Sequence, residues 1–237
     1  MNFVNQANYD SLYSEGKAFL RWPADWILRF NNMFLNDRLP KNARMLDFGC
    51  GSGNNAIPFL KQSYEVHGVD VAPSSKELVE KNLEFHGLGR DFSDRLVILS
   101  PPLLSLPYED NYFDFVLSNQ VHYYSKSEAE LHSLNSELLR IMKPGGVIFV
   151  TMMGPKNYYI TKWSKPNPVN GVYEVRIDDP AHRLAGVSED ILLVESEEEL
   201  LRMFAEFEPE TTGYFDQSMF DLDSNFHWIF VGVKPDS

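Results

Sequence analysis

The chain has 237 residues, of which 43% are hydrophobic, and a formal net charge of −13. This length and apolar content suit one globular domain with a sizeable core, and no stretch approaches the roughly 20 apolar residues of a membrane span. The acidic balance argues against the basic face that nucleic-acid binders use to neutralise phosphates. We therefore expect a small-molecule partner, with neither nucleic acid nor membrane as a partner.

Cysteine usage bears on the compartment. Cys50 is the only cysteine in the sequence, which excludes an intramolecular disulfide and a cysteine zinc cluster and fits a reducing compartment. The first residues, MNFVNQANYDSLYSEG, lack a basic segment followed by an apolar one, so no secretory signal is expected. The sequence thus predicts a cytoplasmic protein.

Apolar strand-like runs and amphipathic helical segments alternate from residue 43 onward. Strands are expected at 43–49, 64–70, 95–99, 113–118 and 147–152, with a late strand at 227–234. Helices are expected at 55–63 and 73–87, from residue 127 to the breaker at 144–146, and from residue 196. Three of these helices open on capping-box pairs, namely Ser74 with Glu77, Ser127 with Glu130, and Ser196 with Glu199.

This alternation predicts an α/β fold with a doubly wound, mainly parallel sheet and helices on both faces. Ligands of such sheets bind at the carboxyl ends of the strands. Two regions lie outside the alternation: an aromatic-rich helical segment at 1–40, and an insertion at about 154–190 within the main domain, 41–237. Each is expected to act as a lid over the site, and the alternative for each is a packed extension.

The stretch LDFGCGSGNN places Gly49, Gly51 and Gly53 between the first strand and the first helix. Such a turn is typical of loops that cradle a nucleotide-like ligand. An NAD-dependent oxidoreductase is one alternative, but its G-x-G-x-x-G fingerprint wants glycine where Asn54 stands. Asp47, two residues before the first glycine, is also a poor neighbour for a pyrophosphate and would suit an ammonium or sulfonium cation better.

A second acid follows the glycines at the distance that a nucleoside site requires. Asp70 ends the second strand, roughly twenty residues beyond the turn, where a carboxylate can accept both ribose hydroxyls of an adenosine. The alternative is a charge at the N-terminus of the helix that follows.

Four successive segments, LDFGCGSG, VHGVD, LPYEDNYFDFVLSNQVHYY and ELLRIMKPGGVIFVT, resemble the motifs of class I S-adenosylmethionine-dependent methyltransferases. The resemblance covers residues 40–152 and, more loosely, the final helix and strand. It implies a Rossmann-like sheet of seven strands whose last strand, HWIFVGVK, is antiparallel and inserted between the fifth and the sixth. It also implies S-adenosyl-L-methionine as cofactor and a methyltransferase activity.

The same resemblance assigns roles to matching residues. The acid and glycines of the first motif would hold the methionine part of the donor, Asp70 the ribose and Val71 the adenine, while Asn119 would line the methyl end. Pro102 stands where relatives carry an acid for the adenine amino group, so the adenine would rely on the Leu103 backbone. The cofactor-binding candidates are Asp47, Gly49, Gly51, Gly53, Asp70, Val71, Leu103 and Asn119.

The acceptor side is less defined. SNQV lacks the N-P-P-Y arrangement of enzymes that methylate exocyclic amines of DNA bases, and it lacks the carboxylates of a metal site, so no metal is expected. His122 is the candidate general base, and a packed core histidine is the alternative. The candidate substrate-binding residues, each of which could instead pack or be solvated, are Tyr9, Tyr13, Arg21, Tyr123, Tyr158 and Trp163.

The sequence therefore predicts a methyltransferase for the O- or N-methylation of a small molecule such as a sugar or a phenolic. Two further hypotheses stay open: a non-catalytic S-adenosylmethionine-binding domain, and the NAD-dependent oxidoreductase.

Overall fold

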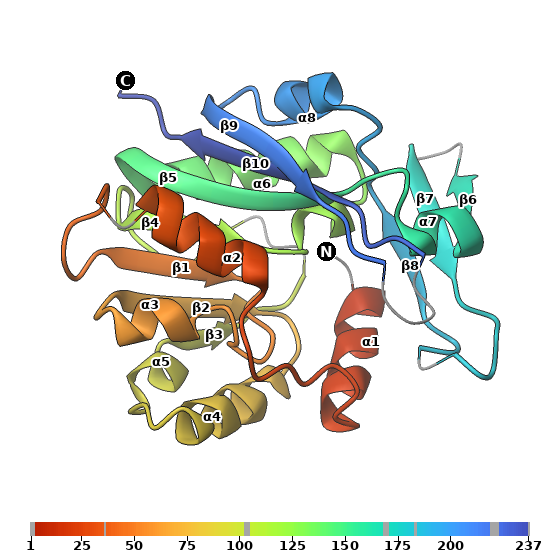
Figure 1. Ribbon diagram of the computed structural model, residues 1–237, viewed down its shortest axis with the longest axis horizontal. Coiled ribbons are helices and arrows are strands. Elements are labelled where there is room, and N and C mark those ends of the chain that lie inside the picture. The colour runs from red at the N-terminus through yellow and green to blue at the C-terminus, as the bar shows by residue number, and fades with distance from the viewer. Residues whose placement is uncertain are drawn as a thin grey trace.

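A seven-stranded sheet forms the centre of the computed structural model, which describes residues 3–35, 37–101, 105–167, 171–182, 184–218 and 223–236. The strand order is β3-β2-β1-β4-β5-β10-β9, in which β10 runs antiparallel to both of its neighbours (Figure 1). The predicted fold class is confirmed, including the antiparallel last strand. The strands are β1 Arg44–Phe48, β2 Glu65–Asp70, β3 Leu96–Ile98, β4 Phe113–Ser118, β5 Met142–Met153, β9 Glu208–Phe215 and β10 His227–Val233.

Helices cover both faces of this sheet, because β1, β2 and β4 are apolar on both sides and each side needs a partner. On one face, the leucine stripe of α6 and the apolar side of α8 pack together in one core cluster. On the other face, α2, α3, α4 and α5 share a second cluster. These helices are α2 Asp25–Phe30, α3 Ile57–Lys61, α4 Ser75–Phe85, α5 Asp91–Asp94, α6 Glu128–Ile141 and α8 Glu197–Met203.

Helix starts follow the capping-box prediction in two of three cases. Ser127 accepts a hydrogen bond from the backbone N–H of Glu130, and Ser196 accepts one from that of Glu199, both at 3.2 Å. The prediction is wrong for Ser74, whose backbone is already helical and whose hydroxyl instead donates to the carbonyl of Asp10 at 3.2 Å. A tertiary contact with the N-terminal segment has replaced the local cap.

The predicted helix stop at 144–146 also differs. Helix α6 ends at Ile141, and the strand β5 begins directly at Met142, so Pro144 and the two glycines belong to the start of the strand. Residue Phe113 of β4 pairs with Met142, and the register shifts before Phe115 pairs with Val147. This bulge accommodates the glycines at the exposed beginning of the strand.

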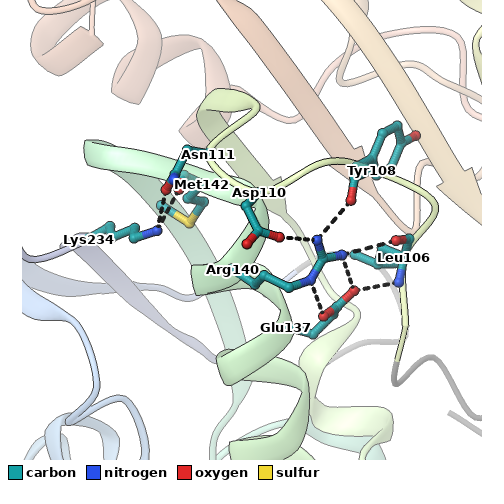
Figure 2. A network of polar contacts seen from close by, with 8 residues as sticks. All are labelled: Leu106, Tyr108, Asp110, Asn111, Glu137, Arg140, Met142 and Lys234. Atoms are coloured by element: carbon teal, nitrogen blue, oxygen red, sulfur yellow. Dashed lines mark hydrogen bonds and ion pairs between the residues drawn. The ribbon is translucent and has the colours of Figure 1, made fainter.

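An arginine network fixes the loop that leads into β4. Arg140 of α6 donates to the carbonyls of Leu106 and Tyr108 and to the carboxylates of Glu137 and Asp110, at 2.7–3.1 Å (Figure 2). Close by, Lys234 donates to Asn111 Oδ1 and to the carbonyl of Met142, at 2.7 and 2.8 Å. Pro102 and Leu103, on which the adenine prediction rests, lie outside the described residues.

A smaller three-stranded antiparallel sheet lies beside the carboxyl ends of the main strands, in the order β6-β7-β8 (Figure 1). It consists of β6 Ser164–Asn167, β7 Val172–Arg176 and β8 Ser188–Ile191, and it follows helix α7, Tyr158–Trp163. The helix α1, Phe3–Ser14, lies between this sheet and α4 (Figure 1). Asn8 of α1 donates to the carbonyl of Ser188 in β8 at 3.1 Å.

None of the helices in the described ranges is both long enough and apolar enough to cross a membrane.

Candidate functional site

The turn after β1 is held against the end of β2 by backbone hydrogen bonds. The N–H groups of Gly49 and Cys50 donate to the carbonyl of Val69 at 2.7 and 3.1 Å. The N–H of Gly51 donates to Asp70 Oδ2 at 2.7 Å, and the N–H of Ala72 donates to Oδ1 at 2.9 Å. The Asp70 carboxylate thereby fixes the shape of both turns at the carboxyl edge of the sheet.

Two of the glycines are required by backbone conformation and by close packing. Gly51 has φ +53° and Gly53 has φ +71°, a region that side chains rarely adopt. A Cβ at Gly51 would lie 2.7 Å from the hydroxyl of Tyr13, whereas one at Gly53 would lie 2.9 Å from the ring of Phe92. Gly51 therefore allows Tyr13 of α1 to approach the turn, and Gly53 allows the turn to pack on Phe92 of α5.

Two buried carboxylates meet at this edge. Burial, followed by the charge of Asp70, raises the pKa of Asp47 to about 8. Burial also raises the pKa of Asp70, against the lowering effect of its backbone hydrogen bonds. Asp47 Oδ2 is buried without a hydrogen-bond partner among the described residues. An orphaned buried oxygen of this kind is costly unless a donor or a cation approaches it.

The segment between α1 and α2 closes over the glycine turn. The hydroxyl of Ser52 and the amide of Asn82 donate to the carbonyl of Leu20 at 2.7 and 2.8 Å, and the amide of Asn54 donates to the carbonyl of Trp22 at 3.0 Å. Asn54, which breaks the dehydrogenase fingerprint, therefore binds this covering segment. The structure gives it a role that a glycine could not fill.

These contacts enclose a cavity of about 400 Å³ at the carboxyl ends of β1, β2 and β4. Its walls carry the carboxylates of Asp25 and Asp70 and aromatic rings from both sides, and none of its described residues is a lysine or an arginine. A cavity with this charge suits a cationic ligand and would repel a pyrophosphate. We call it the donor cavity.

A second cavity of about 310 Å³ adjoins the first and shares Tyr9, Tyr123, Tyr124 and Gln120 with it. One of its walls comes from the small sheet and includes Glu189 of β8, and His227 of β10 also lines it. Burial lowers the pKa of His227 to about 4, so this imidazole is neutral. We call this space the acceptor cavity.

The structure gathers most of the predicted residues at these two cavities. Gly49, Gly51, Asp70, Val71 and Asn119 line the donor cavity, with Asp47 buried next to it. The amide oxygen of Asn119 accepts a hydrogen bond from the indole of Trp26 at 2.9 Å. Tyr9, Tyr13 and Tyr123 also line one or both of the cavities.

Other predicted substrate residues lie elsewhere. Tyr158 is 3% exposed and packs in the interior without lining either cavity. Trp163 packs against His182, with ring centroids 6.0 Å apart. The guanidinium of Arg21 lies over the rings of Phe19 and Phe85 at the surface. Each of these side chains has turned to a local aromatic partner, which the sequence spacing does not reveal.

His122 was expected on the rim of the site, and this placement is wrong. The short 3-10 helix η2, His122–Tyr124, turns its ring into the core, where it is fully buried beside Phe48 and Phe204. Its Nδ1 lies 2.6 Å from the hydroxyl of Ser118. Burial lowers its pKa to about 3, so the imidazole stays neutral at physiological pH. Such a ring is poorly placed to collect a proton from a ligand.

We therefore expect His122→Ala to lower the free energy of unfolding by about 2–3 kcal/mol, because a buried ring leaves a cavity. Donor binding, measured by calorimetry on folded protein, should not change. The matched control is His132→Ala. It removes a partly exposed histidine of α6 whose ring contacts Glu206. A His122→Ala protein with unaltered stability and abolished turnover would restore the base assignment.

Sequence reasoning missed several lining residues. Gln120 has φ +61° and its N–H donates to Thr151 at 2.7 Å, which presents this residue to both cavities. Glu189 lies on a strand, SEDI, that is short and polar and gives no strand signal. Tyr124 was noted in the sequence as the second tyrosine after His122 but was not proposed as a site residue. Its position in both cavities follows from the conformation of η2.

Comparison with known proteins agrees with this geometry. Residues 46–150 match the model of a family described as "Methyltransferase domain". The matched range runs from β1 to β5 and includes the glycine turn and Asp70. This part of the chain is thus similar to a methyltransferase domain.

Among curated relatives, norajmaline N-methyltransferase of Rauvolfia serpentina is 27% identical over 56% of this chain and 43% of its own length. A tRNA (carboxymethyluridine(34)-5-O)-methyltransferase of Arabidopsis thaliana is 26% identical over 66% of this chain and 35% of its own. The chain thus spans less than half the length of these relatives.

The fold also matches solved structures. The 1,6-didemethyltoxoflavin-N1-methyltransferase of Burkholderia thailandensis, solved with its namesake compound and S-adenosylhomocysteine, has a TM-score of 0.63 at 18% identity. The match covers 98% of this chain and 88% of that one, and at this identity it establishes the shared fold.

Proposed function

We propose that the chain is an S-adenosylmethionine-dependent methyltransferase whose acceptor is a small molecule. The domain match and the acidic donor cavity support the cofactor. The acceptor cavity carries the rest of the proposal, because a space of about 310 Å³ that shares a wall with the donor cavity suits a ring-sized molecule better than a polynucleotide. The net charge of −13 also opposes an RNA acceptor.

The residues present fit the donor. Asp47, with an unpartnered carboxylate oxygen, lies where a cation of the methionine part would meet it, and Asp70 offers its carboxylate to the ribose. Gly49 and Gly51 line the cavity with their backbone, and Val71 lines it for the adenine. We infer that Asn119, held by Trp26, faces the methyl end.

When bound, the donor supplies a methyl group already activated on a sulfonium. The chain then has to align the acceptor, exclude water and, for a hydroxyl acceptor, remove a proton. Tyr9, Tyr123 and Tyr124, which line both cavities, stand at the junction where the acceptor atom must lie. The covering segment at residues 18–24, bound to the glycine turn, shields the donor cavity from solvent.

The test is to incubate the purified chain with methyl-labelled S-adenosylmethionine and, separately, with a small-metabolite extract and with bulk tRNA. Release of S-adenosylhomocysteine with the label in a small molecule is expected. Label in tRNA would overturn the small-molecule proposal. Donor binding without transfer to any acceptor would indicate the non-catalytic donor-binding domain.

A further inference from the structure

One face of strand β8 carries a carboxylate within an otherwise apolar row. Val187, just before the strand, and Glu189 and Ile191 within it all line the acceptor cavity, as side chains two residues apart on one face of a strand do. Val175 of β7 pairs with Glu189 and lines the cavity as well. Asp190, between Glu189 and Ile191, does not line it. Among the described residues, Glu189 is therefore the one charged side chain that the strands of the small sheet contribute to this cavity.

Two hydrogen bonds hold β8 against the elements that carry tyrosines of the acceptor cavity. Before Glu189, Asn8 of α1 donates to the carbonyl of Ser188 at 3.1 Å, and α1 and β8 lie side by side (Figure 1). After Glu189, the N–H of Leu192 donates to the carbonyl of Tyr123 in η2 at 2.7 Å. Because these contacts stand on either side of Glu189 in the sequence, the backbone at Glu189 has a defined place beside both α1 and η2.

The rings of Tyr9, Tyr123 and Tyr124 line the same cavity in different orientations. The planes of Tyr9 and Tyr124 are inclined by 76° with centroids 5.7 Å apart, and those of Tyr123 and Tyr124 by 56° with centroids 4.6 Å apart. Rings at such angles surround a compact group better than they stack on one flat molecule. The face of an aromatic ring attracts a cation. A carboxylate and several inclined rings around one cavity are a combination that suits an ammonium group.

The acceptor cavity holds little positive charge to balance Glu189. Among the described residues, Lys17 is the only lysine or arginine that lines it, and its ammonium lies 2.6 Å from Glu15, with both side chains about half exposed. His227 is neutral, because burial lowers its pKa to about 4. Burial raises the pKa of Glu189 to about 7. A cationic ligand would supply the positive charge that stabilises this carboxylate in its ionised form.

We propose that the acceptor is a ring-sized organic cation whose ammonium group binds Glu189 beside the tyrosine rings, while its apolar body packs on Val175, Val187 and Ile191. Glu189 lines the acceptor cavity and not the donor cavity. We therefore assign it a role in selecting and positioning the acceptor, with no part in the bonds that form and break. The inference rests on the proposed function and adds to it the chemical class of the acceptor.

The test compares benzylamine, which is a cation at about pH 8, with benzyl alcohol, a neutral molecule of nearly the same shape. Calorimetry measures both at that pH, where a carboxyl with a pKa of about 7 is mostly ionised, and with the full chain saturated by S-adenosylhomocysteine so that the donor cavity is filled. Wild type should bind benzylamine at least about tenfold more tightly, because only the cation makes a charge-assisted hydrogen bond and contacts with ring faces. Equal affinities, or tighter binding of the alcohol, would overturn the cationic acceptor.

Glu189→Gln keeps the size of the side chain and removes its charge. This variant should lose about tenfold or more in affinity for benzylamine and bind benzyl alcohol as wild type does. Glu174→Gln is the matched control, because Glu174 is exposed on the neighbouring strand β7 and pairs with Asp190 in place of Glu189. It should behave as wild type, and thermal melting shows that each variant is folded. A folded Glu189→Gln chain that still prefers benzylamine as wild type does would overturn the role of Glu189.

Calorimetry with S-adenosylhomocysteine alone separates the two levels of inference. A wild-type chain that binds this product but shows no saturable binding of benzylamine contradicts the cationic acceptor and leaves the donor site intact. A chain that does not bind S-adenosylhomocysteine contradicts the proposed function itself.

Discussion

Asp70→Ala should weaken S-adenosylmethionine binding by about a hundredfold to ten-thousandfold in a protein that remains folded. The substitution removes a carboxylate from the donor cavity and, with it, the two charge-assisted hydrogen bonds that we propose Asp70 makes to ribose hydroxyls, each worth roughly 1.5–3 kcal/mol. It also frees the N–H groups of Gly51 and Ala72, which Asp70 holds at 2.7 and 2.9 Å. Calorimetry measures the affinity, and thermal melting shows whether the fold persists.

Two further variants assign the cause of that loss. Asp70→Asn keeps the size of the side chain and removes its charge, so a loss similar to that of Asp70→Ala would point to charge. Asp94→Ala removes an exposed aspartate of α5, remote from the lining of either cavity, and should bind the donor as wild type does. A folded Asp70→Ala chain with wild-type affinity would contradict the placement of the ribose.

The affinity for S-adenosylmethionine should increase about tenfold for each pH unit between about pH 6 and pH 8 and then level off. Since the pKa of Asp47 is raised to about 8, this carboxyl is protonated in the free protein below that pH. A sulfonium or ammonium cation beside it stabilises the ionised form, so binding releases a proton. S-adenosylhomocysteine, which lacks the sulfonium charge, should show a smaller pH dependence.

Asp47→Asn isolates the part of the pH dependence that Asp47 causes, because titration of the ligand itself affects the wild type and the variant equally. Its affinity should lack the additional rise that wild type shows. The effect of pH on the free energy of unfolding has the opposite sign. In the folded chain Asp47 keeps a proton that the unfolded chain loses above about pH 4. Asp47 therefore makes the ligand-free protein less stable as pH rises from about 4 to 8. The melting temperature of Asp47→Asn should therefore fall less over that range. If affinity and melting temperature changed with pH in the same way in wild type and Asp47→Asn, Asp47 would not titrate between pH 4 and pH 8.

The positions of most strands of the main sheet could be predicted because these strands are apolar runs bounded by turns and helices. β9 was not predicted from its own residues: EPETTGYF is largely exposed and has neither an apolar run nor a clear alternation. The small sheet was missed for the same reason, since SKPN and SEDI are polar and short. Their strand pairing comes from tertiary context, which intrinsic propensity does not encode.

Five of the eight predicted donor residues, Gly49, Gly51, Asp70, Val71 and Asn119, line the donor cavity, whereas three of the six predicted substrate residues, Tyr9, Tyr13 and Tyr123, line either cavity. Asp70 and the glycines sit at strand ends, and chain order alone brings strand ends to one edge of a parallel sheet. His122 also follows a strand end, but a single turn of 3-10 helix decides whether its ring points into the cavity or into the core. The same turn directs Tyr123 and Tyr124 to the cavities. No periodicity distinguishes these directions over three residues.

The small sheet β6-β7-β8 lies within residues 164–191, and among the described residues its strands pair only with one another. The family match ends at residue 150, before this stretch begins. The matched range contains the glycine turn, Asp70 and Asn119 of the donor cavity, whereas the residues that the small sheet contributes to the acceptor cavity lie outside it. Under the proposed function, we expect substitutions in the small sheet to change the choice of acceptor while the strands beside the donor cavity stay unchanged, so that selection could adjust the two properties independently.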